Sequence, residues 1–340
     1  MSYRLGMLAR CDLGGLAAQT WEAFRHLHPA ATVVMDLGPA GRGPGDPARY
    51  VHLADEWGGE VTMVEGAQIP EHAARWLAER CDTIFTAETT YGAYVPDVAA
   101  AHDAQVVVQA NPELYREADY PGARIVLPTP WEADRVPAAE RVLEVPLALD
   151  VLTYRHRTNV EVLYHPAAPA MADRNGTYLL AGALPLMRRP ARLLVRGDAR
   201  RLTRRNDHRV TMLGPYLGLY HDAYPPEADV LVIPRRYAGN FMGAQEAAAL
   251  GMPVVALDLE PQRAWPHVVT VPTSSRQSIQ MRGGAFDVHA CTPDALATVL
   301  DELLADPDRV AELSAAGRVW AEARSWEAMH ATYVEALAPR

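Results

Sequence analysis

The stretch DVLVIPRRYAGNFMGAQEAAALGMPVVALD, residues 229–258, decides the fold of this chain. It begins with an apolar run that ends at Pro234, continues through a loop containing Gly239, and then has the composition of a helix. Gly251-Met252-Pro253 turns the chain into a second apolar run. The order strand, glycine loop, helix and strand predicts one unit of a parallel α/β sheet. Backbone N–H groups at such a helix start can bind a diphosphate or a sugar hydroxyl without a metal ion.

The same alternation extends over both halves of the chain and predicts two doubly wound, Rossmann-like domains. A first strand at 3–9 is followed by a glycine turn and a helix at 16–28. Further strands are expected at 31–37, 60–65, 82–88, 105–110 and 123–128 in the first half, and at 191–198, 209–214, 228–234, 253–258 and 267–272 in the second. Residues 155–176 interrupt the pattern and are expected to contain the hinge, and residues 38–49 form a Gly/Pro-rich loop. We therefore predict domains at 1–150 and 151–324, with a last helix at 325–340 that can return to the first domain.

Composition and charge exclude several classes of protein. The chain contains 32 basic residues, all of them arginine, so Schiff-base chemistry and a Walker lysine are excluded. Residues 1–150 carry 11 arginines against 22 acidic residues, and an acidic domain makes nucleic acid an unfavourable partner. Cys11, Cys81 and Cys291 are far apart, which predicts buried thiols, with a catalytic Cys11 as the alternative. The absence of a leader and of an 18-residue apolar run predicts a cytoplasmic protein without a transmembrane segment.

The segment from Gly239 to Val255 resembles the retaining glycosyltransferases of family 4, as found in actinobacteria and their phages. The family's stretch E-G-F-G-x-x-x-x-E-A-x-A-x-G-x-P-V-V is matched at Gly239, Phe241, Glu246, Ala247, Ala249, Gly251, Pro253 and Val255. The family's first glutamate falls at Ala238, which leaves its pair of carboxylates incomplete, and Asn240 is expected to take over part of that work. The resemblance implies the GT-B architecture, in which two Rossmann-like domains face each other across a cleft. It also implies that Glu246 binds the donor ribose and that the amides from Asn240 through Met242 to Gly243 face the sugar and phosphate.

Other segments are similar to further parts of the same family's donor site. DRNGTYLLAGALPLM at 173–187 is similar to its R-x-x-x-K-G segment, with Asn175 in the lysine place and Arg174 as the remaining diphosphate-binding cation. LARCDLGGLAAQ at 8–19 places Gly14 and Gly15 in the family's first glycine loop. Arg196, within an arginine-rich run from 188 to 209, is a candidate to reach the nucleotide, and Tyr216 a candidate to stack on the base. Each segment also has a purely structural interpretation, as a surface arginine, a chain-reversing turn, a solvated face or a half-buried aromatic ring.

Acceptor residues are expected at the carboxyl ends of the first domain's strands, where open parallel sheets bind ligands. The candidates are Glu88 after the strand at 82–88, and Asn111 and Glu113 after the strand at 105–110. The two glutamates either orient the acceptor hydroxyl or cap helices. We find no histidine at these strand ends, so the family's histidine is not carried over.

These observations predict a glycosyltransferase that uses neither a metal ion nor a cofactor. The expected co-substrate is a UDP-, GDP- or ADP-linked sugar, and the acceptor a small molecule, a glycan or a protein, with retention of configuration. The only D-x-D element, Asp306-Pro307-Asp308, lies between expected helices and away from strand ends. The alternatives are a sugar-nucleotide epimerase of the same fold, a non-catalytic sugar-nucleotide-binding protein and, less favoured by the acidic first domain, a DNA-base glycosyltransferase.

Overall fold

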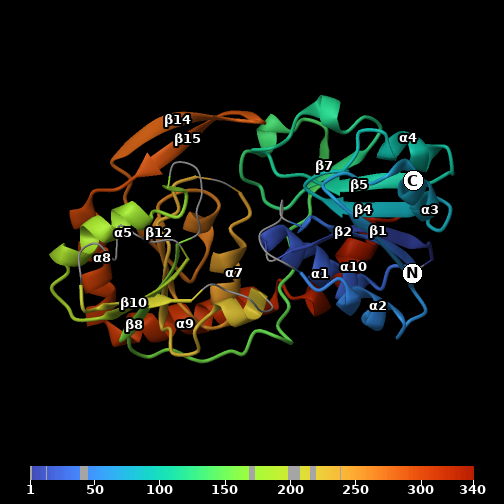
Figure 1. The fold of residues 1–340 in the computed structure, drawn as a ribbon. Coiled ribbons are helices and arrows are strands. Elements are labelled where there is room, and N and C mark those ends of the chain that lie inside the picture. The colour runs from blue at the N-terminus through green and yellow to red at the C-terminus, as the bar shows by residue number, and fades with distance from the viewer. Residues whose placement is uncertain are drawn as a thin grey trace. The chain divides into compact units, whose positions relative to one another are not determined.

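The structure, a computed structural model, describes residues 2–12, 14–38, 45–167, 173–197, 207–214, 220–237 and 239–340. The chain divides into two compact units. Unit 1 contains the residues up to Pro146 and those from Trp326 onward, and unit 2 contains most residues between Leu147 and Ser325. Tyr216 and Ala238, two positions that the sequence singled out, lie outside the described residues. Figure 1 labels the elements of both units.

Unit 1 is built on a parallel sheet of seven strands with the order β3-β2-β1-β4-β5-β6-β7. The order reverses between β1 and β4, which are adjacent although α1 and two further strand–helix units separate them in sequence. Its elements are β1 (Leu5–Cys11), α1 (Gly15–Leu27), β2 (Ala31–Asp36), α2 (Ala48–Ala54), β3 (Glu60–Glu65), α3 (Glu71–Ala78), β4 (Thr83–Ala87), α4 (Val95–Ala100), β5 (Gln105–Gln109), β6 (Arg124–Leu127), β7 (Ala139–Val142) and α10 (Trp326–Ala336).

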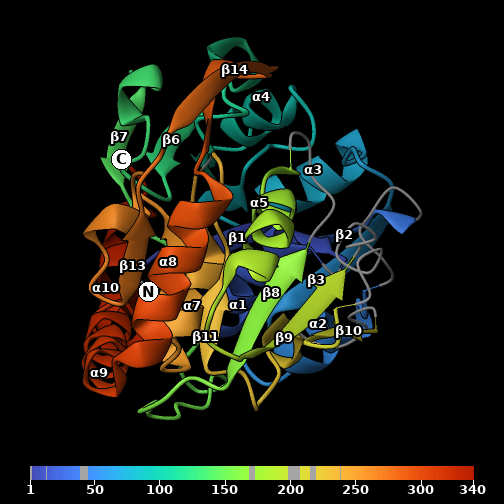
Figure 2. The ribbon, with the colours of Figure 1, turned by 90° about the vertical axis from the view of Figure 1, so that its left-hand side faces the viewer.

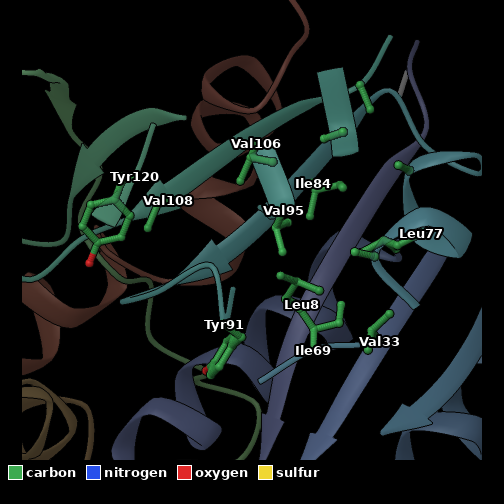
Figure 3. Packing of buried hydrophobic residues seen from close by; sticks show 14 of the residues in the cluster. Leu8, Val33, Ile69, Leu77, Ile84, Tyr91, Val95, Val106, Val108 and Tyr120 are labelled. Atoms are coloured by element: carbon green, nitrogen blue, oxygen red, sulfur yellow. The ribbon is translucent and has the colours of Figure 1, made fainter. Parts of the chain in front are cut away.

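The core of unit 1 forms because alternate strand residues point to the same face of the sheet. On one face Leu8, Ile84 and Val106 pack against Leu77 of α3 and Val95 of α4 (Figure 3). All of these side chains are buried. The carboxyl ends of the strands are therefore held in a fixed order by a continuous apolar layer.

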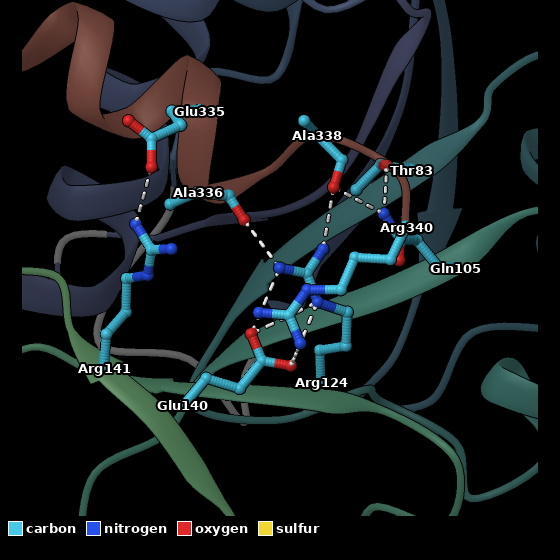
Figure 4. A network of polar contacts seen from close by, with 9 residues as sticks. All are labelled: Thr83, Gln105, Arg124, Glu140, Arg141, Glu335, Ala336, Ala338 and Arg340. Atoms are coloured by element: carbon cyan, nitrogen blue, oxygen red, sulfur yellow. Dashed lines mark hydrogen bonds and ion pairs between the residues drawn. The ribbon is translucent and has the colours of Figure 1, made fainter.

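The last helix and the chain end are fastened to unit 1. The guanidinium of Arg124 on β6 donates to the carbonyl oxygens of Ala336 and Ala338, at 3.0 and 2.9 Å, and forms an ion pair with Glu140 (Figure 4). Gln105 donates to the oxygen of Ala338 at 2.9 Å. Helix α10 thus packs on the sheet of unit 1 although it follows unit 2 in sequence.

Unit 2 is built on a second parallel sheet, of six strands, with the order β10-β9-β8-β11-β12-β13. Figure 2 shows β8 and β9 running in the same direction. Helices α5 and α8 cover one face of this sheet, and α7 covers the other. Its elements are β8 (Val162–Ala167), α5 (Thr177–Ala183), β9 (Arg192–Gly197), β10 (Val210–Leu213), β11 (Val230–Val232), α7 (Met242–Ala249), β12 (Val254–Leu257), β13 (Val268–Val271), α8 (Pro293–Ala305) and α9 (Pro307–Glu322).

The expectation that residues 155–176 only interrupt the pattern is wrong, because they contain β8, a central strand of the second sheet. Val162 and Tyr164 face one side of the sheet and Leu163 the other, and all three are buried. Pro166 near its end weakened the signal of this six-residue strand in the sequence. The proline is tolerated because β11 pairs only with Leu163 and Tyr164.

Besides β8, three further strands have no counterpart among those expected from the sequence. One is β7, an edge strand with only four residues. The others are β14 (Ser275–Met281) and β15 (Gly284–Ala290), which form an antiparallel hairpin apart from both sheets. The hairpin is fixed to the segment before α7, because the amide of His289 donates to the oxygen of Arg236 at 2.8 Å. The Arg236 side chain donates back to the oxygen of His289 at 2.9 Å.

Candidate functional site

The order of the second sheet reverses between β8 and β11, and the donor candidates follow these two strands. Arg174 lies in the turn between β8 and α5, and Glu246 lies on α7, which follows β11. Crevices outside the carboxyl ends of strands at such a reversal are the usual ligand sites of open parallel sheets. The topology therefore brings the two donor segments of unit 2 to the same part of the sheet edge.

Glu246 is a buried residue on α7, the helix that we expect to bind the donor. Its exposed fraction is 7%, and it accepts a hydrogen bond from the hydroxyl of Tyr224. A buried carboxylate needs such donors because its charge is costly to remove from water. The Tyr224 hydroxyl is also within 3.4 Å of the oxygen of Gly243. Glu246 is thus held in one orientation against the first turn of α7.

The loop before α7 is tightly organised. Phe241, the N-cap of α7, has a φ of 44°, in the left-handed region that non-glycine residues rarely adopt. The side-chain amide of Gln245 donates to both oxygens of Asn240, that of the side chain at 2.9 Å. The guanidinium of Arg235 lies 4.8 Å from the centre of the Phe241 ring. The amide of Ala244 donates to the oxygen of Phe241 at 3.1 Å, whereas Met242 and Gly243 occupy the first helical positions, whose amides have no intrahelical acceptor.

The turn that carries Arg174 is fixed by its neighbours. Asp173 accepts the amides of Thr177 and Tyr178, both at 2.9 Å, and so caps α5. Gly176 has a φ of 72°, and a Cβ there would collide with the oxygen of Pro234. Asn175, in the place of the family's lysine, instead donates to the oxygen of Pro166 at 2.8 Å. Its amide therefore serves the structure of the turn in this conformation.

Arg174 is joined to the segment that leads into the α7 loop. Its carbonyl oxygen accepts the amide of Arg236 at 2.8 Å, and its guanidinium lies 5.3 Å from the centre of the Tyr237 ring. A guanidinium over an aromatic face keeps its charge and its donors. The structure thus connects the Arg174 turn with the loop before Glu246 by a direct backbone hydrogen bond.

His165, which the sequence analysis did not single out, joins the two central strands under this site. The residue is fully buried on β8, with Nδ1 2.7 Å from the oxygen of Val232 on β11 and Nε2 2.8 Å from the hydroxyl of Thr177. Burial lowers the pKa of His165 to about 4. The imidazole is neutral, Nδ1–H donates to the carbonyl, and Nε2 accepts from Thr177. No sequence motif would have revealed it, because the signal is a three-dimensional meeting of β8, β11 and α5.

Arg196 at the end of β9 makes contacts within unit 2. Its guanidinium donates to the oxygen of Ala223 at 3.1 Å and to that of Gly214 at 3.2 Å. Tyr164 donates to the same oxygen of Ala223 at 2.8 Å. In this conformation Arg196 supports the segment that precedes Tyr224.

In unit 1 the glycine loop lies at the corresponding reversal, between β1 and β4. The carboxylate of Asp12 accepts the amide of Gly14 at 2.8 Å and pairs with the guanidinium of Arg10 at 2.6 Å. Gly14 is the N-cap of α1, and a Cβ on Gly15 would meet no described atom within 4 Å. Asp12, which the sequence analysis passed over, thus fixes the start of the loop.

Two of the three acceptor candidates meet at the ends of β4 and β5. Asn111 donates from its amide to the carboxylate of Glu88 at 3.2 Å, and Tyr120 donates to the backbone oxygen of Glu88 at 2.7 Å. Glu88 has a φ of 68°, which is strained for a residue other than glycine. Glu113 is buried, and its exposed fraction is 5%. The N-cap of α4 is Tyr94, which makes no side-chain cap hydrogen bond.

Tyr91 is another residue that the sequence did not reveal. It lies in the loop after β4, near the strand ends in Figure 3, and also has a left-handed backbone, with a φ of 56°. Its hydroxyl is buried and has no hydrogen-bond partner among the residues that the structure describes. Burial raises the pKa of Tyr91, and the charges of Arg10, Glu88 and Asp12 also act on it. The hydroxyl therefore lies close to the polar residues at the β1–β4 reversal.

Comparison with protein families gives a match in the second half of the chain. Residues 165–306, from β8 to the end of α8, match the family described as Glycosyl transferases group 1. The matched segment contains the Arg174 turn, the loop before α7 and Glu246. A comparison with the curated proteins finds no match.

Solved structures resemble the whole chain in fold. HepE of Anabaena, in complex with UDP and glucose, has a TM-score of 0.68 and 14% identity, over 98% of this chain and 99% of that one. Sucrose-phosphate synthase of Thermosynechococcus elongatus has a TM-score of 0.66 and 15% identity, over 98% of each chain. The lipopolysaccharide outer core galactosyltransferase WaaB has a TM-score of 0.62 and 10% identity, over 98% of each chain. At these identities the likeness establishes the fold alone.

The two parallel sheets, each with its ligand candidates at the reversal of strand order, define the GT-B class of fold. This confirms the fold class expected from the sequence. On this fold, the match to the family described as Glycosyl transferases group 1 covers residues 165–306. None of the helices in the described ranges has the length and apolarity needed to span a bilayer.

Proposed function

We propose that this chain transfers a sugar from a nucleoside diphosphate to an acceptor hydroxyl, with retention and without a metal ion. The observation that carries the proposal is the buried carboxylate of Glu246, oriented by Tyr224 at the reversal of strand order in unit 2. A carboxylate at that place can accept the two hydroxyls of a ribose. The amides at the start of α7 can donate to the sugar and to the phosphate oxygens next to it.

The proposed donor is UDP-linked, and GDP- and ADP-linked sugars are the alternatives. HepE, which shares the fold, has been crystallised with UDP and with UDP-glucose. These complexes support the class of donor, and the residues around Asn240 are proposed to select the sugar. Ala238, in the place of the family's first glutamate, offers no carboxylate to the sugar.

The leaving diphosphate needs compensating charge, because cleavage of the glycosidic bond leaves an added negative charge on it. Arg174 supplies a permanently charged fork, and the amides at the start of α7 add fixed dipoles. In the retaining reaction, the bond from the sugar carbon to the diphosphate breaks while the acceptor oxygen bonds to the same face. The acceptor proton leaves with the diphosphate.

The proposal that the reaction needs no metal ion rests on the groups that the chain offers to the diphosphate. Of the acidic pair Asp306-Pro307-Asp308, Asp306 caps α9 by accepting the amide of Arg309 at 2.9 Å. Helix capping explains why Asp306 lies at the start of α9. The arginines and backbone amides of the donor segments can balance the diphosphate charge instead.

Transfer of a labelled sugar from a panel of UDP-, GDP- and ADP-sugars to a panel of hydroxyl acceptors tests the proposal. Each reaction is run in EDTA and in magnesium, and the anomeric configuration of the product is read by NMR. We expect equal rates in both conditions and a retained configuration. Complete loss in EDTA that magnesium restores overturns the metal-free proposal, and conversion of the donor without an acceptor indicates an epimerase.

A further inference from the structure

We propose that unit 2 carries a second anion site, separate from the donor site, in which Arg188 and Arg189 bind a phosphate-bearing ligand. The site is a cavity of about 650 Å³. It is lined by Pro185, Met187, Arg188, Arg189, Pro190, Asp207, His208 and Arg209. Its volume lies within the range of about 300 to 1,000 Å³ that is common for small-molecule sites.

The cavity lies at the edge of the second sheet opposite to the donor candidates. Arg188 and Arg189 precede β9, and Asp207 to Arg209 precede β10, so both lining segments enter their strands at the amino end. Because β9 and β10 run parallel to β8 and β11, the Arg174 turn and α7 lie at the other, carboxyl, edge. The cavity therefore cannot be part of the donor site of the same sheet.

The backbone of the two arginines is fixed in place by α8. The carboxylate of Asp301 accepts the amide of Arg188 at 2.9 Å and the amide of Arg189 at 3.0 Å. Met187, the residue before Arg188, has a buried side chain that anchors this segment. Two neighbouring guanidinium groups are thus presented from a rigid segment, which lowers the entropic cost of binding an anion.

Inside the cavity, the described lining residues offer Arg188 and Arg189 no carboxylate partner of their own. Asp207 is the one carboxylate among the described lining residues, and it pairs with Arg209 at 2.6 Å. Hydrogen bonds from Arg209 lower the pKa of Asp207 to about 2, so this pair stays formed at neutral pH. Neither Arg188 nor Arg189 has a carboxylate within ion-pair distance in the described ranges. Two positive charges therefore remain in a chain whose net charge is -10.

The lining residues indicate the class of ligand. Paired guanidinium groups match the oxygens of a phosphate, with which they form forked, charge-assisted hydrogen bonds. Pro185, Met187 and Pro190 offer an apolar wall for the group that carries the phosphate. A second cavity shares the two arginines and contains Asp294, Asp301 and Glu302, which makes that neighbouring side unfavourable for an anion. We assign the phosphate to the first cavity, whether it belongs to a soluble ester or to a lipid headgroup.

The inference is tested by titration calorimetry with inorganic pyrophosphate, in protein that carries Arg174→Ala to weaken the donor site. We expect the added double variant Arg188→Ala and Arg189→Ala to weaken binding at least tenfold. The side chains of Arg188 and Arg189 are exposed, and their backbone amides still donate to Asp301 in the variant. We therefore expect the fold to be retained, which circular dichroism checks. The matched control is Arg192→Ala, an exposed arginine on β9 that does not line the cavity.

A second arm separates the two sources of phosphate. Cosedimentation with vesicles of phosphatidylglycerol is compared with vesicles of phosphatidylcholine, with the same variants. Phosphatidylglycerol binding that the double variant loses and Arg192→Ala keeps assigns the site to a lipid headgroup, and a response to pyrophosphate alone assigns it to a soluble ligand. If the double variant and the control behave alike with both probes, the second site does not exist. None of these readouts requires sugar transfer, so they stand apart from the proposed reaction.

Discussion

The hydroxyl of Tyr224 donates a hydrogen bond to the carboxylate of Glu246, and this pair connects the segment before β11 with the donor helix α7. Tyr224 also touches the first turn of α7 through the oxygen of Gly243, 3.4 Å away. If Glu246 binds the donor ribose, Tyr224 sets the direction in which its carboxylate points.

The variant Tyr224→Phe removes the hydroxyl and keeps the ring. A hydrogen bond to a charged group contributes about 1.5 to 3 kcal/mol, so we expect the donor KM to rise by about tenfold to 100-fold. The acceptor KM should stay unchanged, and steady-state kinetics with each substrate varied in turn measures both. A variant with the donor KM of the wild type would show that Tyr224 does not position Glu246.

The variant Arg174→Ala tests the cation assigned to the leaving diphosphate. Loss of one preorganised donor to a developing charge typically costs about 100-fold to 1,000-fold in turnover, so we expect a fall of that size in kcat. The backbone oxygen that accepts the amide of Arg236 remains in the variant. Arg192→Ala is the control, and equal turnover in both variants would exclude Arg174 from the reaction.

The variant Tyr91→Phe distinguishes a binding role of the buried hydroxyl from a structural one. An unsatisfied buried hydroxyl costs about 1 to 3 kcal/mol, so Tyr91→Phe should leave the melting temperature unchanged or raise it. If the hydroxyl bonds to the acceptor, the same variant raises the acceptor KM about tenfold and leaves the donor KM unchanged.

Thermal melting and acceptor kinetics of Tyr91→Phe decide the question together. An unchanged acceptor KM with a raised melting temperature would mean that the hydroxyl is only a packing defect. A lowered melting temperature would mean that it has a partner in the fold.

Two buried histidines should make the free energy of unfolding depend on pH. Burial lowers the pKa values of His165 and His267 to about 4, below the ordinary value of 6.5. Between pH 6.5 and 4 the unfolded chain binds protons that the folded chain does not, so the free energy of unfolding falls as the pH is lowered through this window. Each shift corresponds to about 3 kcal/mol. Urea unfolding at pH 7 and pH 4.5 measures the loss, which the variant His165→Gln should reduce; an equal loss in the variant would contradict the assignment.

The helix at 16–28 and most strands of both sheets could be predicted because their apolar runs are bounded by glycine, proline or polar turns. Strand β8 could not, because Pro166 lies in it and its place in the sheet depends on partners far along the chain. The prediction of a donor site rests on the motif spacing around Glu246, whereas the contacts of His165 and Tyr224 and the buried hydroxyl of Tyr91 are visible only in the tertiary structure. Local sequence indicates backbone geometry and motif spacing. It does not indicate which distant residues orient a buried polar group.

The most direct measurement is the affinity of the protein for nucleotide sugars in the presence of EDTA, determined by calorimetry for the wild type and for Glu246→Gln. The substitution keeps the size of the side chain and removes the charge that would accept the ribose hydroxyls. The account predicts that one of the UDP-, GDP- or ADP-linked sugars binds to the wild type without a metal, and that Glu246→Gln weakens this binding at least tenfold. Equal affinity of the two proteins for that donor, or binding only after magnesium is added, would contradict the account.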